Sequence, residues 1–490
     1  MASADRSLVK RHALWFAALM LAVFTLVPAP AGLTVAGWRM LGILAFAVVV
    51  WMTETISYPV SAAALLALMA VLLGAAPAVE DTSKVLGTAG GLGIALSGFA
   101  NTAWALVAGA LFLAAAMTRT GLDRRIALVV LARIGARTNR VLMGVILVGF
   151  LLSFFVPSTT ARVSCLVPIV MGIIAVFGVE KRSRFAGMML IATAQADSLW
   201  NVGIKTAAAQ NMVAVSFIQK QLGVDITWLR WFVAAAPFSA IMSVVLYWVL
   251  MKMMPPEVKE IPGGREAVSR NLAALGPMTA AEKRLLAFSL ALLGFWVTEG
   301  WLHKLDTATT TIVAVTLMLL PRIGVMTWEE AQSRIPWGTL TLFGVGISLG
   351  SALLSTQAAT WLARQIVAGF GLQQASALLI LAALAAFLVL IHLGFASATG
   401  LAAAMIPIII SVLQTVKTPG INVVGLTMVL QYVVSFGMIL PVNAPQNMIA
   451  YSTGTFEVRD FVRTGIPLTI AAYLLVLLLG ATYWRWLGLV

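Results

Sequence analysis

The sequence predicts an all-α membrane protein built from two inverted repeats. Three observations lead to this fold class. The chain of 490 residues is 61% hydrophobic and only 10% charged, with a mean hydropathy of +0.99. Two apolar blocks are too long for one membrane crossing and carry small polar residues at their middles. Three short motifs recur in the same order in the two halves. We therefore expect about 11 transmembrane helices plus two re-entrant helical hairpins.

The apolar stretches set the expected spans, because a crossing needs about 20 mostly apolar residues. They cover residues 13–30, 37–52, 58–75, 102–117, 186–219, 228–252, 285–301, 308–321, 336–355, 421–450 and 465–487. The expected domains are an N-terminal helix in 1–36, a first repeat in 37–252, a cytoplasmic linker in 253–284 and a second repeat in 285–490. Each repeat contains one hairpin, 141–177 or 374–413, and one broken helix, 186–219 or 421–450.

The basic residues indicate orientation rather than a nucleic-acid partner. The net charge is +14, but the Lys and Arg residues lie in short loops between apolar runs. Cytoplasmic loops of membrane proteins are enriched in Lys and Arg. This pattern predicts a multi-pass protein of the cell inner membrane with a cytoplasmic N-terminus and an external C-terminus. Lipid is then the surrounding solvent.

Three recurring motifs predict the repeat. Trp51–Glu54 (WMTE) recurs as Trp296–Glu299 (WVTE), Ser158–Thr160 (STT) as Ser397–Thr399 (SAT), and Gln210–Ala214 (QNMVA) as Gln446–Ala450 (QNMIA). The offsets are 296 − 51 = 245, 397 − 158 = 239 and 446 − 210 = 236. Five expected crossings separate the first pair of copies, so the repeats should be opposite in orientation. Inverted repeats are typical of secondary transporters, whose binding site lies at the repeat interface.

Small polar clusters interrupt four apolar segments, at residues 156–162, 201–211, 394–400 and 440–447. Non-helical backbone at membrane depth occurs where it is buried in protein or lines a polar cavity. Such breaks expose helix N-termini, which attract anions, while hydroxyls and carbonyls can complete a cation site. The alternative is that Ser and Thr here only join helices or bond to their own backbone. The symmetric placement favours a site for a small anionic substrate.

Charged residues at membrane depth are costly and usually functional. Lys205 lies inside the first broken helix and Arg162 follows the first hydroxyl cluster. Either can balance an anionic substrate or stand in for a bound cation, and snorkelling is the alternative for both. Asp197 is expected to pair with Lys205 or to take part in proton movement.

Other function classes receive little support. The sequence contains no nucleotide-binding, transition-metal or nucleophile motif, so we expect no cofactor and no enzyme activity. A passive channel remains an alternative, but two opposed midplane breaks suit an occluded site better. Sodium or protons are the expected coupling ions.

At these four interruptions the chain resembles the divalent anion/sodium symporter family, which carries dicarboxylates, tricarboxylates or sulfate. That family has Ser-Asn-Thr at each hairpin tip and roughly Gly-Thr-Pro-Pro-Asn at each helix break. Here Ser158-Thr159-Thr160 and Ser397-Ala398-Thr399 stand at the tips. Residues 207–211 (AAAQN) and 443–447 (NAPQN) stand at the breaks. The sequence motifs at the two tips are closest to those of the citrate/dicarboxylate exchanger branch, although the motif at the second break does not match that branch.

The resemblance implies a homodimer in which a mobile transport domain moves against a scaffold like an elevator. It implies that the substrate is bound at the tips and breaks, by Ser158, Thr159, Thr160, Ser397, Ala398, Thr399, Thr206, Ala208, Asn443 and Ala444. It places a cation site, or its surrogate, at Lys205, Gly203, Ala207, Asn211 and Asn447.

Two departures from the family pattern concern the driving ion. The tip asparagines are replaced by Thr159 and Ala398, and Lys205 is added near the first cation site. An ammonium group there can substitute for sodium. The driving force is therefore open among sodium, protons and a counter-anion. The cargo alternatives are sulfate, a sulfonate or arsenite, or sodium/proton exchange on the same scaffold.

Overall fold

The computed structural model describes residues 2–134, 137–176, 179–258 and 264–490, and the described chain is helical without a β-strand. The first half contains α1 (Ala2–Leu26), α2 (Val35–Thr53), α3 (Tyr58–Leu68) continued by the π-helical η1 (Met69–Leu73), α4 (Thr88–Leu96), α5 (Thr102–Thr120), α6 (Leu122–Ile134), α7 (Thr138–Phe155), α8 (Thr159–Val176), α9 (Arg184–Gly203), η2 (Lys205–Ala207), α10 (Ala209–Leu222) and α11 (Trp228–Met253). The linker carries α12 (Gly264–Ala274).

The second half repeats this order. It contains α13 (Ala280–Thr298), α14 (Thr307–Leu319), α15 (Trp328–Gln332), α16 (Trp337–Ser355), α17 (Ala358–Gly369), η3 (Leu372–Gln374), α18 (Ala377–His392), α19 (Ala398–Thr415), α20 (Val423–Val434), η4 (Pro441–Asn443), α21 (Pro445–Ser452), α22 (Val458–Ala481) and α23 (Tyr483–Trp486). A long helix, a short helix, a hairpin and a broken helix follow one another in both halves, as α5 to α10 and as α16 to α21. This order agrees with the repeat that the three motifs predict.

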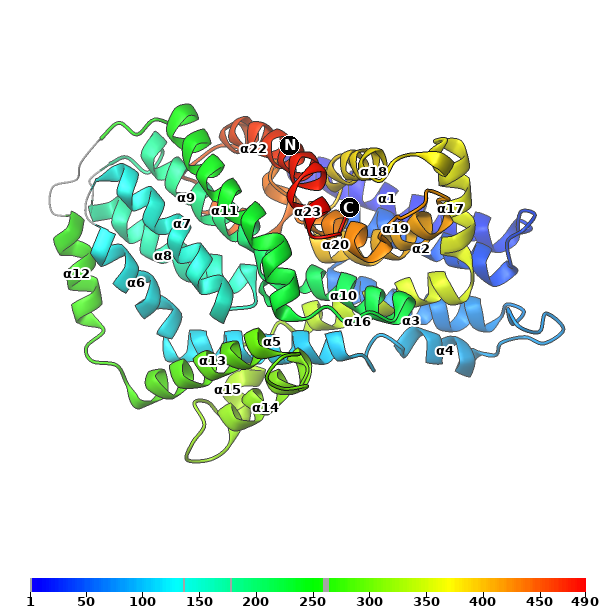
Figure 1. The fold of residues 1–490 in the computed structure, drawn as a ribbon, viewed down its shortest axis with the longest axis horizontal. Coiled ribbons are helices and arrows are strands. Elements are labelled where there is room, and N and C mark those ends of the chain that lie inside the picture. Colours follow the sequence, from blue (N-terminus) through cyan, green and yellow to red (C-terminus); the bar gives the residue numbers. More distant parts are fainter. Residues whose placement is uncertain (1, 135–136, 177–178, 259–263) are drawn as a thin grey trace.

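The expected hairpins and breaks are present. In each hairpin block two helices meet at a non-helical tip, which spans residues 156–158 between α7 and α8 and residues 393–397 between α18 and α19. Each broken helix is interrupted by a short 3₁₀ turn, η2 or η4. Figure 1 shows the two hairpins on opposite sides of the view, with α10 and α20 between them.

Helix length explains why breaks are needed. Seven described helices are long and apolar enough to cross a membrane, and six shorter apolar ones accompany them. At 1.5 Å per residue, the 14 residues of α10 span about 21 Å, against a hydrocarbon core of about 30 Å. The short halves of the broken helices, α10, α20 and α21 with 14, 12 and 8 residues, are therefore too short to cross the membrane alone.

The helices α4, α6 and α17 were not predicted. Residues 122–134 lie between the expected spans, among the basic connections, because Arg124, Arg125 and Arg133 interrupt the apolar run. The structure makes them a helix whose apolar face, with Leu128 and Leu131, is buried. A search for apolar spans misses a helix that is polar on one face, because the polar residues lower the average hydropathy of the segment.

Local capping positions several helices. Thr34, Asn101, Ser183, Thr227, Asp306, Ser376 and Asn422 each accept a backbone N–H in the first turn of the helix that follows. Such caps satisfy N–H groups that the helix leaves unpaired. They fix where α9 and α20, the two helices that lead into the breaks, begin.

Candidate functional site

The first hairpin tip presents three hydroxyl groups with different roles. Ser158 Oγ accepts the backbone N–H of Ala161 at 3.3 Å and so caps α8. Thr159 Oγ1 donates to Asn201 Oδ1 of α9 at 2.8 Å. The Thr160 side chain is exposed, and within the described residues no hydrogen bond engages its hydroxyl. The tip therefore offers an unengaged hydroxyl beside the N-terminus of α8.

The second tip repeats the serine cap. Ser397 Oγ accepts the N–H of Gly400 at 3.2 Å, the same three-residue step as in the first tip. Ala398 and Thr399 are half-buried beside it. Both expected tip serines thus bond to their own backbone, as the structural alternative proposed, but each hydroxyl keeps a hydrogen to donate.

Arg162 is the cation that holds the first tip. Its side chain is fully buried, 0% exposed, as is that of Asp197, and Nε donates to Asp197 Oδ1 at 2.7 Å. Nη1 donates to Val156 O of the tip at 2.7 Å and to Ala207 O of the break at 3.1 Å. Nη2 donates to Asn201 Oδ1 at 2.7 Å. One guanidinium thus joins the tip, α9 and the first break.

This arrangement corrects the expectation that Asp197 pairs with Lys205. The Lys205 ammonium lies elsewhere, where Nζ donates to Ile226 O at 2.6 Å and to Thr307 Oγ1 at 3.3 Å. Thr307 Oγ1 in turn donates to Glu299 Oε2 at 2.7 Å. Lys205 therefore connects the first break to the start of α14, away from the tip carbonyls.

The second tip is held by an amide instead of a guanidinium. Asn443 Nδ2, in η4, donates to the carbonyls of His392, Leu393 and Phe395 at 2.9, 3.2 and 3.1 Å. Its repeat mate is Ala207 (443 − 236 = 207), which has no such group. The two tips are thus fixed by different side chains at different positions.

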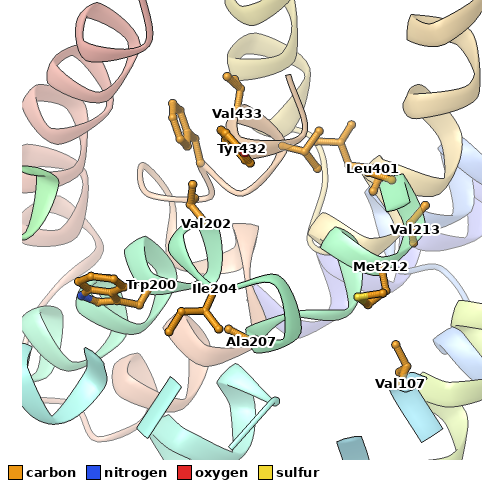
Figure 2. Close-up of a cluster of buried hydrophobic side chains, with 14 of the residues drawn as sticks. Val107, Trp200, Val202, Ile204, Ala207, Met212, Val213, Leu401, Tyr432 and Val433 are labelled. Carbon is orange, nitrogen blue, oxygen red and sulfur yellow. The ribbon is translucent and has the colours of Figure 1, made fainter. Parts of the chain in front are cut away.

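The positions that match Arg162 and Asp197 in the second repeat are apolar. They are Leu401 (162 + 239) and Val433 (197 + 236), and both are 0% exposed. Figure 2 shows Leu401 and Val433 in a cluster of buried hydrophobic side chains with Val202, Ile204 and Ala207 of the first break. A buried ion pair in one repeat therefore corresponds to packed aliphatic side chains in the other.

Reciprocal hydrogen bonds join the two breaks. Gln210 Nε2 of the first break donates to Ser435 Oγ of the second at 3.3 Å. Gln446 Nε2 of the second break donates to Ser198 Oγ of α9, the helix that leads into the first break, at 3.0 Å. Gln195 Nε2 adds a bond to Met438 O at 3.0 Å. These contacts make one polar unit of both broken helices.

Asn211 and Asn447 close the two breaks in the same way. Asn211 Nδ2 donates to Asn201 O at 2.6 Å and Asn447 Nδ2 donates to Gly437 O at 2.8 Å, each ten residues back. Their Oδ1 atoms are buried with no partner among the described residues. Both asparagines are therefore structural ties, with one acceptor left on each.

The remaining expected residues surround these ties. Gly203, Ala208 and Ala444 are buried at the breaks, and Thr206 Oγ1 accepts the indole N–H of Trp228 at 3.2 Å. Sequence reasoning missed Gln195, Ser198 and Asn201 as members of the network. Single polar residues in a buried helix carry no pattern of their own, and only the Gln-Asn repeat gave a signal.

The residues at the first tip do not fit a sodium ion in addition to Arg162. A sodium ion needs several free oxygen ligands, and the carbonyls of Val156 and Ala207 already accept from the guanidinium. At the second tip, three carbonyls accept from Asn443. No group of three or more His, Cys, Asp or Glu side chains that could hold a metal ion was found among the described residues.

Comparison with known proteins agrees with this fold. A family model described as "Sodium:sulfate symporter transmembrane region" matches residues 8–490. A membrane protein of Cupriavidus necator is 59% identical over 97% of this chain and 92% of its own length. The sodium-dependent dicarboxylate transporter SdcS of Staphylococcus saprophyticus is 26% identical over 87% of this chain and 82% of its own. The citrate/succinate antiporter of Escherichia coli is 25% identical over 94% of this chain and 95% of its own length.

A solved structure supports the fold alone. The YdaH transporter of Alcanivorax borkumensis superposes with a TM-score of 0.54 at 14% identity, over 86% of this chain and 97% of that one. The resemblance to divalent anion/sodium symporters is confirmed by the family match over nearly the whole chain. This chain is therefore a member of the sodium:sulfate symporter family, a helical membrane transporter and not an enzyme.

Proposed function

We propose that this protein exchanges small dicarboxylate anions across the cell inner membrane, without sodium at the first tip. Its relatives include proteins named as a citrate/succinate antiporter, an L-tartrate/succinate antiporter and the inner membrane protein YbhI. The dianion binds between the N-termini of the helices that begin at the tips and breaks. Thr160 and Thr399 donate to its carboxylates, assisted by Ser158 and Ser397.

The observation that carries this proposal is the Arg162 guanidinium. It binds the carbonyl oxygens of Val156 and Ala207, at the place where a coupling cation needs ligands. Asp197 balances its charge, so the tip is held without substrate and without ion. A tip ordered by a permanent side chain needs no sodium to order it. Uptake then depends on a counter-anion that returns the carrier.

The proposed motion is an elevator in which the hairpins and broken helices move against the remaining helices. Polar contacts between α10 and its neighbours support this division. Asn101 Nδ2 donates to Ser216 Oγ at 3.0 Å, and Lys220 Nζ donates to Ser351 Oγ at 2.9 Å. Like the Lys205 contact to Thr307, these are single hydrogen bonds that can break and reform during a cycle. A homodimer, as in the family resemblance, would supply the stationary frame.

Reconstituted protein tests the proposal directly. Proteoliposomes are loaded with succinate, malate, citrate or sulfate, or with buffer alone, and uptake of labelled succinate is measured with sodium or choline outside. We expect uptake that requires an internal dicarboxylate and is equal in sodium and choline. Uptake driven by sodium into empty vesicles would contradict the role of Arg162. If no dicarboxylate moves under any condition, the substrate class is wrong, and sulfate or another anion takes its place.

A further inference from the structure

A cavity of about 610 Å³ lies beside the first hairpin. Its walls come from four elements, the end of α5, the start of α6, α8 and the linker helix α12, and Figure 1 shows α6, α8 and α12 as neighbours. Thr118, Arg124, Ser164 and Asn271 line it and are exposed, so the cavity is open on the linker side. Its volume is many times the roughly 30 Å³ that one water takes up in the liquid.

One face of α8 runs from this cavity to the first tip. Thr160, Ser164 and Pro168 are exposed and recur at steps of four residues, which places them on the same side of the helix. The opposite side, with Arg162, Leu166 and Val170, is fully buried. Ala161, Ser164 and Pro168 line the cavity, and Thr160 continues the exposed face at its tip end. An exposed face of α8 that carries the hydroxyl groups of Ser164 and Thr160 therefore extends from the cavity to the first tip.

Two charged residues line this cavity: Arg124, which is exposed and supplies its positive charge, and Asp123, which is only 4% exposed. Within the described residues the Arg124 guanidinium has no ion pair and no hydrogen bond, although its backbone N–H is bound by Asp123 Oδ1 at 2.7 Å. The neighbouring Arg125 is engaged, because Nε donates to Glu282 Oε1 at 2.6 Å and Nη1 to Gly276 O at 2.9 Å. Arg125 thus fixes the linker at the cavity mouth, and Arg124 is left to face a diffusing ion.

The second tip is packed closely against α2. A Cβ atom on Gly400 would lie 3.3 Å from Trp51 Cε3, and one on Gly394 would collide with Met52 Cε. Both residues of α2 therefore cover the second tip closely.

We propose that this cavity is the aqueous entry route for anions from the linker side to the first tip, and that Arg124 selects for negative charge in it. This inference rests on the proposed function for one point only, namely that the anion admitted by the route is a dicarboxylate. A fixed cation in a water-filled, protein-walled cavity raises the local concentration of anions and lowers that of cations. Arg124 acts on entry and is not a ligand at the tips.

Cys165 is a built-in probe of this route, because it lines the cavity and is the sole cysteine of the chain. The full-length protein in proteoliposomes is treated with two membrane-impermeant methanethiosulfonates, one carrying a sulfonate and one a trimethylammonium group. Each rate of Cys165 modification, read by mass spectrometry, is divided by the same reagent's rate with a free small thiol. Ser164→Cys in a Cys165→Ser background gives a second, more exposed probe on the same wall.

One positive charge about 4 Å away in water enriches an anion about fivefold and depletes a cation about fivefold, so we expect the anionic reagent to react up to about 25-fold faster than the cationic one after this correction. Arg124→Gln should remove the preference and raise the KM for succinate, with kcat unchanged. Arg133→Gln, at the exposed far end of the same helix, removes an equal charge and should change neither.

Two results would overturn the route. If both cysteine probes are inert in transporting protein, the cavity is dry or filled with lipid. If they react but Arg124→Gln leaves the charge preference unchanged, Arg124 is not the selecting residue. Protection by succinate is a separate readout, so charge-selective labelling without succinate protection would leave the route intact and count against the dicarboxylate proposal.

Discussion

Replacing the Arg162–Asp197 pair by its repeat mates tests the role of the pair. The second repeat has Leu401 and Val433 at these positions, so the relevant variants are Arg162→Leu alone and Arg162→Leu with Asp197→Val. The single variant leaves a carboxylate that is 0% exposed without its cation. Removing one partner of a buried ion pair costs about 3–5 kcal/mol, because the other charge stays buried and uncompensated.

The double variant should be more stable than the single one. It removes the orphaned carboxylate as well, so the carbonyls of Val156 and Ala207 lose the donor that Arg162 supplied, whereas Asn201 Oδ1 keeps its bond from Thr159. Coupling between groups in one network reaches about 2–3 kcal/mol, and we expect the double variant to recover that amount. Adding Ala207→Asn, which copies Asn443, should recover about 1 kcal/mol more by donating to the first tip.

The assay is thermal unfolding of the purified proteins in one detergent at one scan rate. Equal scan rates matter because membrane proteins unfold irreversibly and their midpoints depend on rate. The expected order of midpoints is wild type, then triple, double and single variant. A single variant as stable as wild type, or a double variant no better than the single, would refute the idea that Arg162 neutralises Asp197. Succinate exchange by the triple variant, with and without sodium, shows whether the tip also needs the charge.

Three further predictions concern other contacts. Lys205→Ala should change the rate of exchange but leave it independent of sodium, because Nζ bonds to Ile226 O and Thr307 and not to a tip. If uptake by this variant requires sodium, Lys205 stands in for a bound cation after all. Gln210→Leu and Gln446→Leu should each lower stability by about 1 kcal/mol, since each breaks one of two reciprocal bonds, and a chemical unfolding series measures both. Burial raises the pKa of Glu282, but hydrogen bonds from Arg125 and Thr279 outweigh it and leave the pKa below its usual value of 4.5. A depressed carboxyl pKa stabilises the fold above pH 4.5 and loses that contribution as the pH falls through the folded value, so wild type should lose its advantage over Glu282→Gln in acid.

The hairpins and breaks were predictable because small polar residues interrupt long apolar runs, as at 156–162 and 394–400. A hydropathy profile detects these interruptions from the local sequence alone, independently of what the helices pack against. The amphipathic helices α6 and α17 were missed, since Arg124, Arg125 and Arg364 lower the apolar average of segments that still bury one face.

The candidate site was only partly predictable. Arg162, Asp197 and Lys205 stood out as charges in apolar surroundings, but their pairing depends on rotamers and on the path of α9 and α10. Sequence spacing placed Asp197 eight residues before Lys205, whereas in the fold Arg162, 35 residues away in sequence, lies closer. The repeat offsets show that Arg162 and Asn443 are not at matching positions. Both side chains nevertheless donate to the carbonyls of a hairpin tip, and this appears only when the two copies are compared in the fold.

The reciprocal bonds between the breaks set an order of events during synthesis. Gln210 bonds a serine 225 residues further along the chain, and Ser198 accepts from a glutamine 248 residues further along. At about 5–20 residues per second, the first half therefore waits in the membrane for roughly 11–50 s before its partners emerge from the ribosome. During that interval the side-chain amides of Gln195 and Gln210 lack the acceptors that the second half supplies. A truncated product that ends before residue 435 should accordingly be a substrate for membrane quality-control proteases, even though every helix of its repeat has been made.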